Sequence, residues 1–432
     1  MPRKKNIFGI GLVGAGTVGG GVAKILAEKA DLLAERAGMR LEIVRVADLD
    51  EKRIRMLSIP KSRIAASADE VIQDAKVDVV LELVGGTTVA YDIVAKALKA
   101  GKSVVTANKA LLAERGRDLF ALAREKGLPL AFEAAVCAAI PIIRALRDGL
   151  VADRLESLLG IVNGTCNYIL TQMLEKGKPY REALAEAQRL GFAEADPAFD
   201  VEGYDSAHKL ALLAALGFDT QVDFHALPVE GISRLALSDL HMAREMGYVA
   251  KLLAVARPRD GRLFLSVHPG LLSEEHPLAS VSGSMNAVAL FGDAVGEAMY
   301  YGRGAGALPT ASAVLSDVVE LARARARGSL PHRWYPRAQN RFEPAALADY
   351  ECPYFVRFTV LDRCGVLGAI ATLLGEERVS IASVVQKGLA DAGVPIVLLT
   401  HVAREGNLRR AIERIEGQDF IVAPTAVMRV EG

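Results

Sequence analysis

The stretch Gly14-Ala15-Gly16-Thr17-Val18-Gly19 decides the fold of the N-terminal region. It follows an apolar run at 7–13 that predicts a buried strand, and it opens an apolar-periodic segment at 18–37 that predicts a helix. A G-x-G-x-x-G pattern in this context is typical of dinucleotide binding, because glycines permit a tight turn and bring the main chain and the helix N-terminus close to a pyrophosphate. A glycine loop without a ligand is the alternative. The predicted cofactor-binding residues are Gly14, Gly16, Thr17, Val18 and Gly19.

Further apolar runs alternate with helical patterns as far as residue 132. Strand-like segments lie at 41–47, 77–83, 103–106 and 128–132. This alternation predicts an α/β domain of the Rossmann type, in which a doubly wound parallel sheet is covered by helices on both faces.

Asp48 ends the second predicted strand and bears on the choice of cofactor. A carboxylate at this position accepts a hydrogen bond from the ribose 2′-hydroxyl of NAD and repels the 2′-phosphate of NADP. Lys52, Arg53 and Arg55 follow and can pair with a phosphate, although a solvated helix face explains each of them as well. The sequence leaves the choice between NAD and NADP open.

The composition of the 432-residue chain excludes several classes of function. It has 52 Lys and Arg against 52 Asp and Glu, so no net charge attracts nucleic acid or an anionic membrane. The four cysteines form no C-x-x-C pair, which is typical of an intracellular protein with reduced thiols. Neither a membrane span nor a signal-peptide cleavage pattern is recognisable, so we expect a cytoplasmic protein.

The remainder of the chain predicts two further domains and a linker. From residue 134, an alanine-rich segment, an acidic stretch and a helical run at 206–216 predict a central α+β domain. A helix at about 310–325 is followed by residues 328–350, which contain prolines and have little periodicity. Predicted elements over 354–430 then follow the order strand, helix, strand, strand, helix, strand, which is the ferredoxin-like plan.

Two lysines have surroundings that suit catalysis. Lys209 follows Asp205 by four residues, so a helix places both on one face, at the start of an apolar run beside concentrated acidic residues. Burial lowers the pKa of a lysine and makes it a workable proton donor when carboxylates hold it, whereas a surface ion pair is the alternative explanation. Lys109 follows the fourth predicted strand, at the sheet edge where ligands of α/β proteins bind, and a plain residue at a helix N-terminus is its alternative.

Six segments in fixed order resemble the homoserine dehydrogenase family. They are GLVGAGTVGGGV at 11–22, VTANKALLA at 105–113, EAAVCAAIPII at 133–143, GIVNGTCNYIL at 160–170, GFAEADPAFDVEGYDSAHKLALLA at 191–214 and YYGRGAGALPTASAV at 300–314. The resemblance implies reduction of L-aspartate 4-semialdehyde to L-homoserine with NADPH or NADH, a step towards threonine, methionine and isoleucine. The implied domains are a dinucleotide-binding domain at 1–133, completed by about 305–327, a substrate-binding and dimerisation domain at 134–304, a linker at 328–350 and a regulatory domain at 351–432.

The resemblance also implies a role for individual residues. Lys209 is implied as the proton donor to the aldehyde oxygen, and Lys109 as the residue that polarises or positions the reacting groups near the nicotinamide. Glu194 and Asp205 are implied to hold the substrate ammonium, with Asp200 supporting the lysine network. The other implied contacts are those of Gly164 and Thr165 with nicotinamide and substrate, and those of Thr106, Asn108, Lys109 and Gly306 with the cofactor.

Residues 133–140 resemble the family's monovalent-cation loop, which binds sodium or potassium through hard oxygen ligands. The implied ligands are Glu133 and the carbonyls of Val136, Ala138 and Ile140. The chain departs from the family in carrying Cys137-Ala138-Ala139 where glycines are usual. A second departure is Ala47, which replaces an arginine found in many members and weakens the case for NADP.

Residues 351–432 resemble an ACT domain, most clearly at Leu361-Asp362-Arg363-Cys364-Gly365-Val366-Leu367, where Cys364 replaces a usual proline. The resemblance implies feedback inhibition by L-threonine bound between paired ACT domains of a homodimer or homotetramer, and a pure dimerisation module is the alternative.

Two other functions remain open at this point. One is a different amino-acid semialdehyde dehydrogenase, against which the lack of a cysteine in an obvious nucleophile context argues. The other is a non-catalytic sensor of nucleotide and amino acid. A sensor has no need of a proton donor such as Lys209.

Overall fold

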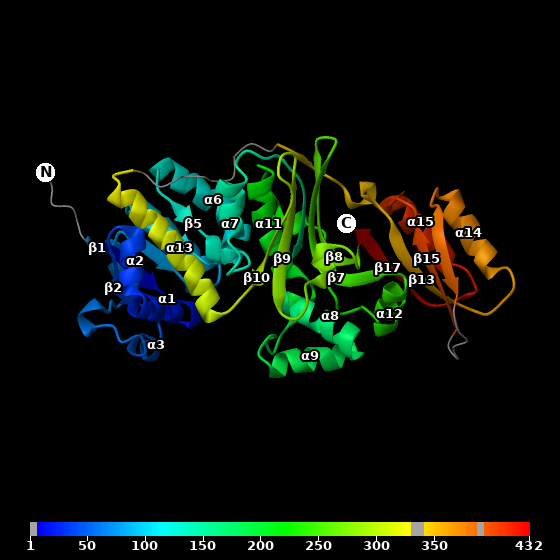
Figure 1. Cartoon of the computed structure of the whole chain (residues 1–432), viewed down its shortest axis with the longest axis horizontal. Coiled ribbons are helices and arrows are strands. Elements are labelled where there is room, and N and C mark those ends of the chain that lie inside the picture. The colour runs from blue at the N-terminus through cyan, green and yellow to red at the C-terminus, as the bar shows by residue number, and fades with distance from the viewer. Residues whose placement is uncertain (1–6, 330–340, 387–392) are drawn as a thin grey trace. The chain divides into compact units, whose positions relative to one another are not determined.

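The computed structural model describes residues 7–329, 341–386 and 393–432 (Figure 1). The chain forms two compact units, and none of the helices in the described ranges is long and apolar enough to span a membrane. The first unit comprises residues up to Leu155, His208–Ala226 and Gly292–Arg341, and the second comprises Glu156–Ala207, Leu227–Phe291 and Phe342–Gly432. The domain boundaries expected from the sequence stay a prediction, and residues 330–340 of the predicted linker lie outside the described residues.

The first unit is built on a parallel sheet with the strand order β2-β1-β3-β4-β5. This order is doubly wound, so the predicted Rossmann-type fold is confirmed. The last strand has two residues and is shorter than the predicted 128–132. The strands are β1 (Ile7–Val13), β2 (Arg40–Ala47), β3 (Val79–Glu82), β4 (Ser103–Thr106) and β5 (Leu130–Ala131).

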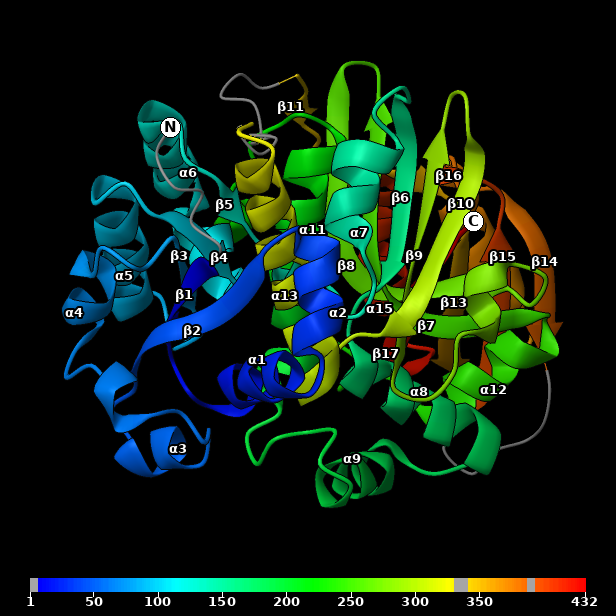
Figure 2. The same cartoon turned by 60° about the vertical axis from the view of Figure 1, so that its left-hand side comes forward.

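The predicted helix at 18–37 is two helices, α1 (Thr17–Glu28) and α2 (Ala30–Ala37). They are separated at Lys29, whose φ of −125° and ψ of 29° are not helical. Against α1 packs α13 (Ala307–Ala326), a helix from the far end of the unit's sequence (Figure 2). Gly21 permits the close approach, because a Cβ there would lie 2.8 Å from the carbonyl oxygen of Ala307.

The other elements of the first unit are mostly short. They are α3 (Glu51–Arg55), α4 (Ala68–Gln73), α5 (Thr88–Lys99), α6 (Lys109–Lys126), α7 (Ile142–Arg144) and β10 (Gly296–Arg303). Helix α11 (Tyr204–Gly217) runs from the second unit into the first.

The second unit contains a long mixed sheet in which β9, β6, β7 and β8 precede the C-terminal strands. The paired strands β7 and β8 are joined by Asp260-Gly261, whose φ angles of 50° and 77° are those of a type I′ hairpin turn. The sequence analysis did not locate these strands, although Asp-Gly between apolar runs is a hairpin signal. The strands are β6 (Leu155–Ile161), β7 (Tyr248–Arg259), β8 (Arg262–Ser273) and β9 (Met285–Gly292), and the helices are α8 (Gly164–Lys176), α9 (Tyr180–Arg189), α10 (Ala198–Val201) and α12 (Leu237–Glu245).

The C-terminal module follows the ferredoxin-like plan predicted for it. Its strands have the order β17-β13-β15-β14, and β17 also pairs in parallel with β8, so the module extends the central sheet (Figure 1). Residues 387–392 lie outside the described residues. The elements are β13 (Tyr354–Val360), α14 (Val366–Glu376), β14 (Ile381–Gln386), β15 (Val394–Thr400), α15 (Glu405–Glu416) and β17 (Ile421–Glu431), preceded by the short strands β11 (Glu343–Pro344) and β12 (Glu351–Cys352), with β16 (Ala403–Arg404) between β15 and α15.

A buried charged cluster lies where β17 meets β8. The fully buried carboxylate of Glu431 accepts hydrogen bonds from the Tyr350 hydroxyl at 2.7 Å and is paired with Arg257 at 2.9 Å and with Nε2 of His268 at 3.2 Å. Burial raises the pKa of Glu431, but the hydrogen bond with His268 and the charge of Arg257 outweigh it and hold that pKa below its usual range. The junction therefore contains a buried negative charge that its neighbours neutralise.

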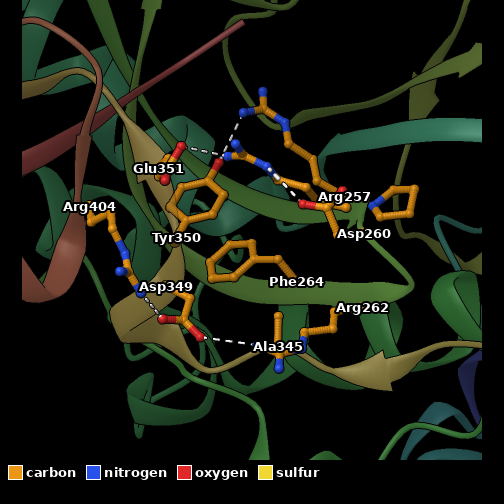
Figure 3. A pocket seen from close by; sticks show the side chains of 11 residues that line it. Arg257, Asp260, Arg262, Phe264, Ala345, Asp349, Tyr350, Glu351 and Arg404 are labelled. Carbon is orange, nitrogen blue, oxygen red and sulfur yellow. Dashed lines mark hydrogen bonds and ion pairs between the residues drawn. The ribbon is translucent and has the colours of Figure 1, made fainter.

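Beside this cluster is a cavity of about 540 Å³ between the β7–β8 hairpin and the segment that leads into the C-terminal module (Figure 3). The rings of Phe264 and Tyr350 stack in it with centroids 3.7 Å apart. Its arginines are each engaged by an acidic neighbour, as in the 2.6 Å pair of Arg259 with Glu351. The other pairs are Arg257 with Glu431, and Arg262 and Arg404 with Asp349. These pairs tie the hairpin to the module.

Candidate active site

The glycine loop lies at the carboxyl end of β1 and requires its glycines. Gly14 has a φ of 100°, and a Cβ there would lie 2.6 Å from the carbonyl group of Leu83. A Cβ on Gly19 would lie 2.1 Å from the carbonyl oxygen of Gly14. The turn thus brings the first N–H groups of α1, including those of Thr17 and Val18, to the sheet edge where a pyrophosphate is bound in this fold.

Asp48, just after β2, is tied to the glycine loop. Its Oδ2 accepts a hydrogen bond from the Ala15 N–H at 2.6 Å, and its Oδ1 accepts one from the Asp50 N–H at 2.8 Å. Arg53 lies beside the same loop, with one guanidinium nitrogen 3.6 Å from the position of a Cβ on Gly16. A carboxylate suited to a ribose hydroxyl and a cation suited to a phosphate therefore flank one loop.

A groove of about 720 Å³ runs along α1 next to this loop, a size within the range of small-molecule sites. Its lining includes Gly16 and Thr17 from the loop, Lys24 from α1, and Arg53 and Ser58 from the segment after β2. The groove offers the cations of Lys24 and Arg53 and also the carboxylate of Glu28, which lies 3.9 Å from Lys24 Nζ.

The segment after β4 carries the predicted Thr106, Asn108 and Lys109. The buried hydroxyl of Thr106 donates to Glu82 at 2.6 Å, and the Asn108 N–H donates back to Thr106 Oγ1 at 3.0 Å. The Asn108 amide donates to the Gly86 carbonyl at 2.7 Å and caps α6 by accepting from the Leu111 N–H. Lys109 is the first residue of α6, so this segment is held at the carboxyl edge of the sheet. Glu82, a fully buried carboxylate at the end of β3, is not among the residues predicted from the sequence.

In the second unit, the predicted Asp200 and Asp205 are brought together with the start of α8. The amide of Asn163 donates to Asp200 Oδ1 at 2.8 Å and to Asp205 Oδ2 at 2.9 Å. Gly164 and Thr165 begin α8, and the Thr165 hydroxyl donates to the Phe192 carbonyl at 2.6 Å. These residues form a compact polar cluster.

The remaining predicted residues of this set differ in exposure. Glu194 is exposed between α9 and α10. Lys209 lies on α11 one helical turn after Asp205, and both are buried, with exposed fractions of 8% and 5%. Burial of Lys209, expected from its apolar neighbours, is confirmed. Gly306 precedes α13 with a φ of 126°, which favours glycine.

The predicted cation loop surrounds a buried carboxylate. Glu133 accepts hydrogen bonds from the Ile143 N–H at 3.0 Å and the Arg144 N–H at 2.9 Å, and its own N–H donates to Asp317 at 3.0 Å. Burial raises the pKa of Glu133 to about 7, against the opposing charge of Arg144. Asp317 is not among the residues predicted from the sequence, although a charge on the apolar face of the predicted helix at 310–325 is a signal for it.

The backbone of this loop carries strain at Cys137 and Ala138, where the resemblance implies glycines. Cys137 and Ala138 have φ angles of 52° and 30°. A side chain in this left-handed region costs about 1–2 kcal/mol. The loop therefore keeps the glycine-type conformation without glycine, and the carbonyls of Val136, Ala138 and Ile140 stay the predicted ligands.

The doubly wound sheet, its glycine loop and the C-terminal module define a class, namely NAD(P)-dependent oxidoreductases with an ACT domain. Residues 14–133 match the family described as homoserine dehydrogenase, NAD binding domain, residues 141–319 match the family homoserine dehydrogenase, and residues 354–419 match the ACT domain.

Whole-chain comparisons agree with these matches. The chain is 45% identical to the homoserine dehydrogenase of Neisseria gonorrhoeae over 427 residues and 43% identical to that of Pseudomonas aeruginosa over 432 residues, with 98% of each chain covered. The crystal structure of a homoserine dehydrogenase from Thiobacillus denitrificans superposes with a TM-score of 0.93 at 41% identity, covering 98% of both chains. A Staphylococcus aureus homoserine dehydrogenase superposes with a TM-score of 0.77 at 30% identity, covering 99% of both chains.

The chain belongs to the homoserine dehydrogenase family. Its activity is that of an NAD(P)-dependent oxidoreductase, as the sequence analysis predicted, and the two alternative functions considered there are set aside.

Proposed function

We propose that Lys209 is the proton donor in the reduction of L-aspartate 4-semialdehyde to L-homoserine. A nicotinamide bound at the glycine loop's domain would supply the hydride that C4 of the aldehyde accepts. As the carbonyl π bond opens, Lys209 Nζ gives its proton to the aldehyde oxygen, so the product is a neutral alcohol and the lysine is left as a neutral amine. The observation that carries this proposal is the burial of Lys209 on the helix whose first turn contains the buried Asp205.

We propose that the surrounding acidic residues bind the ammonium group of the substrate. Asp205 and Glu194 bind the ammonium, Asp200 supports Lys209, and Gly164 and Thr165 contact substrate and nicotinamide. Support comes from the cluster in which one buried amide holds both aspartates beside the start of α8. Lys109, Thr106, Asn108 and Gly306 complete the contacts to the cofactor, with Lys109 positioning the reacting groups.

The choice between NAD and NADP is proposed to depend on Asp48 and Arg53. Both flank the glycine loop, where the carboxylate favours a ribose hydroxyl and the guanidinium favours a phosphate. Arg53→Ala should therefore lower kcat/KM with NADP more than with NAD, and an equal loss with both cofactors would refute a role in the choice.

A sodium or potassium ion is proposed at Glu133 with the carbonyls of Val136, Ala138 and Ile140. Buried carboxylate and carbonyl oxygens are suitable ligands for such an ion. Exchanging sodium and potassium chloride for a bulky organic cation should reduce turnover in the parent protein.

L-Threonine is proposed as a feedback inhibitor that binds to the ACT domains of a cytoplasmic homodimer or homotetramer. The parallel pairing of β17 with β8 supports a route from the module to the catalytic part of the chain. Sedimentation of the protein with and without L-threonine tests the assembly.

The first experiment follows nicotinamide absorbance during L-homoserine oxidation, with NAD and NADP in parallel and each with and without L-threonine. Lys209→Ala should lower kcat by about 10²–10⁴-fold while the Kd for NADPH stays within about twofold, because the lysine acts on the substrate oxygen. Lys178→Ala, which breaks a pair with Glu186 on α9, is a matched lysine control. Loss of nucleotide binding together with turnover in Lys209→Ala would indicate a structural lysine.

A further inference from the structure

Asn163 immediately precedes α8 and uses its whole amide group. Its side-chain oxygen accepts from the Cys166 N–H at 2.8 Å, which caps the helix. Its nitrogen donates one hydrogen bond to Asp200 and one to Asp205. A primary amide has two N–H donors, and here each is directed at a different carboxylate.

The surroundings of Asn163 fix the orientation of the amide. A flipped amide would direct its oxygen at two carboxylates and its N–H groups at the Cys166 N–H, so only the observed orientation is compatible with these neighbours. The residue is 4% exposed, so these bonds do not compete with bulk water. Hydrogen bonds to charged acceptors are about twice as strong as neutral ones.

The start of α8 is itself fixed in the unit. A Cβ on Gly164 would lie 2.6 Å from the carbonyl oxygen of Ser284, so the helix begins against that loop. The carbonyl of Val162 accepts a hydrogen bond from the Asn286 amide at 2.9 Å. The residues on either side of Asn163, Val162 and Gly164, are therefore both fixed by contacts. Its side chain extends from this fixed backbone towards the two aspartates.

We propose that Asn163 is a positioning residue that sets Asp200 and Asp205 at a fixed place relative to the first turn of α8. This inference rests on the proposed function, in which Asp205 binds the substrate ammonium and Gly164 contacts substrate and nicotinamide. The amide also places the positive end of its dipole between two like charges. Without the Asn163 amide, the two carboxylates lose their common hydrogen-bond donor, and their position relative to the start of α8 is no longer fixed. A displacement of about 1 Å in such a group can cost up to about 10²-fold in rate.

Helix capping alone is the competing explanation, and a serine separates the two roles. Asn163→Ser keeps a side-chain oxygen that can cap α8, but it removes the paired N–H donors that face the aspartates. The test uses the full-length protein and compares two competitive inhibitors of L-homoserine oxidation. L-2-aminobutyrate carries the amine and butyrate lacks it. The inhibition constant of butyrate divided by that of L-2-aminobutyrate therefore measures how strongly the protein binds the ammonium group.

In Asn163→Ser we expect this ratio to fall about tenfold, which is the effect of losing hydrogen bonds to a charged group. The KM for L-homoserine should rise by a similar factor, while the Kd for NADPH stays within about twofold. An unchanged ratio together with a lower melting temperature would overturn the inference and leave Asn163 as a helix cap. Asn163→Thr also keeps a capping oxygen and lacks the paired N–H donors, so it gives the same measurement if the serine variant does not fold.

Asn167→Ser is the matched control. Asn167 is buried one turn later on α8, and its amide donates to the carbonyls of Val281 and Met285 rather than to carboxylates. This variant should lower stability without changing the inhibitor ratio. Asp205→Asn separates a failure of the proposed role of Asp205 from a failure of the inference about Asn163. If it leaves the ratio unchanged, the proposed role of Asp205 fails and the inference fails with it, whereas a lowered ratio in Asp205→Asn alone refutes only the role of Asn163.

Discussion

Replacing Glu431 with glutamine should destabilise the junction between β8 and β17. The carboxylate is fully buried and neutralises Arg257, whose side chain is only 26% exposed. It also accepts a hydrogen bond from the Tyr350 hydroxyl and pairs with the buried His268. Glu431→Gln keeps the shape and one acceptor oxygen, but it leaves the guanidinium without its counter-charge in a buried site.

The magnitude follows from the burial of both partners. Removing one partner of a buried ion pair costs about 3–5 kcal/mol. The remaining amide oxygen and the partial exposure of Arg257 place the expected loss at the lower end, about 3 kcal/mol. For a unit of roughly 200 residues, this loss lowers the melting temperature by about 6–12 °C.

The assay is differential scanning calorimetry of the full-length protein beside a matched variant. Glu351→Gln removes a similar pair, in which Glu351 contacts Arg259 at 2.6 Å, but this arginine is 65% exposed. Its cost should be below about 1 kcal/mol. If Glu431→Gln melts within about 2 °C of the parent protein, or no lower than Glu351→Gln, the reasoning about the buried charge is refuted.

Three further predictions concern single residues. Burial lowers the pKa of Lys251 to about 8 from 10.5, so the folded state binds fewer protons than the unfolded chain and the free energy of unfolding rises between pH 8 and 10. Lys251→Met should remove up to about 3 kcal/mol of that rise, and an identical slope in urea titrations of both proteins would contradict it. Gly14→Ala forces a Cβ against Leu83, so NADPH fluorescence titration should show at least about tenfold weaker binding, whereas Gly16→Ala, whose Cβ would meet only the end of the Arg53 side chain at 3.6 Å, should lose less. Ala138→Gly should raise stability by about 0.5–1 kcal/mol by relieving its left-handed φ of 30°, and a lower melting temperature would count against strain in this loop.

Features that depend on neighbouring residues could be predicted from the chain alone. The glycine loop was identified because a turn that excludes Cβ atoms leaves only glycine at Gly14 and Gly19. The order of elements in the C-terminal module was predicted because strand and helix periodicities differ. Where local signals conflict, boundaries were wrong, as at Lys29, which divides the predicted helix at 18–37 into α1 and α2.

The candidate site was only partly accessible to the same reasoning. Lys209 was identified from its acidic and apolar neighbours, which also predict its burial. Asn163 was overlooked, although an asparagine before a helical run is a capping signal. That this residue also holds Asp200 and Asp205 is invisible in the sequence, because about 40 positions separate it from them.

Local pattern in this protein thus specifies which segments become strands and helices, and which residue types can occupy the turns between them. Tertiary structure decides which distant segments meet. The packing of α13 on α1 and the pairing of β17 with β8 join parts of the chain that are far apart in sequence. Backbone hydrogen bonds and apolar contacts can form with any suitable strand or helix. The local pattern therefore does not determine which distant segment a strand or helix contacts. The choice is made by the burial of charges such as Glu431, which is stable only where Arg257 arrives from β7 and His268 from β8.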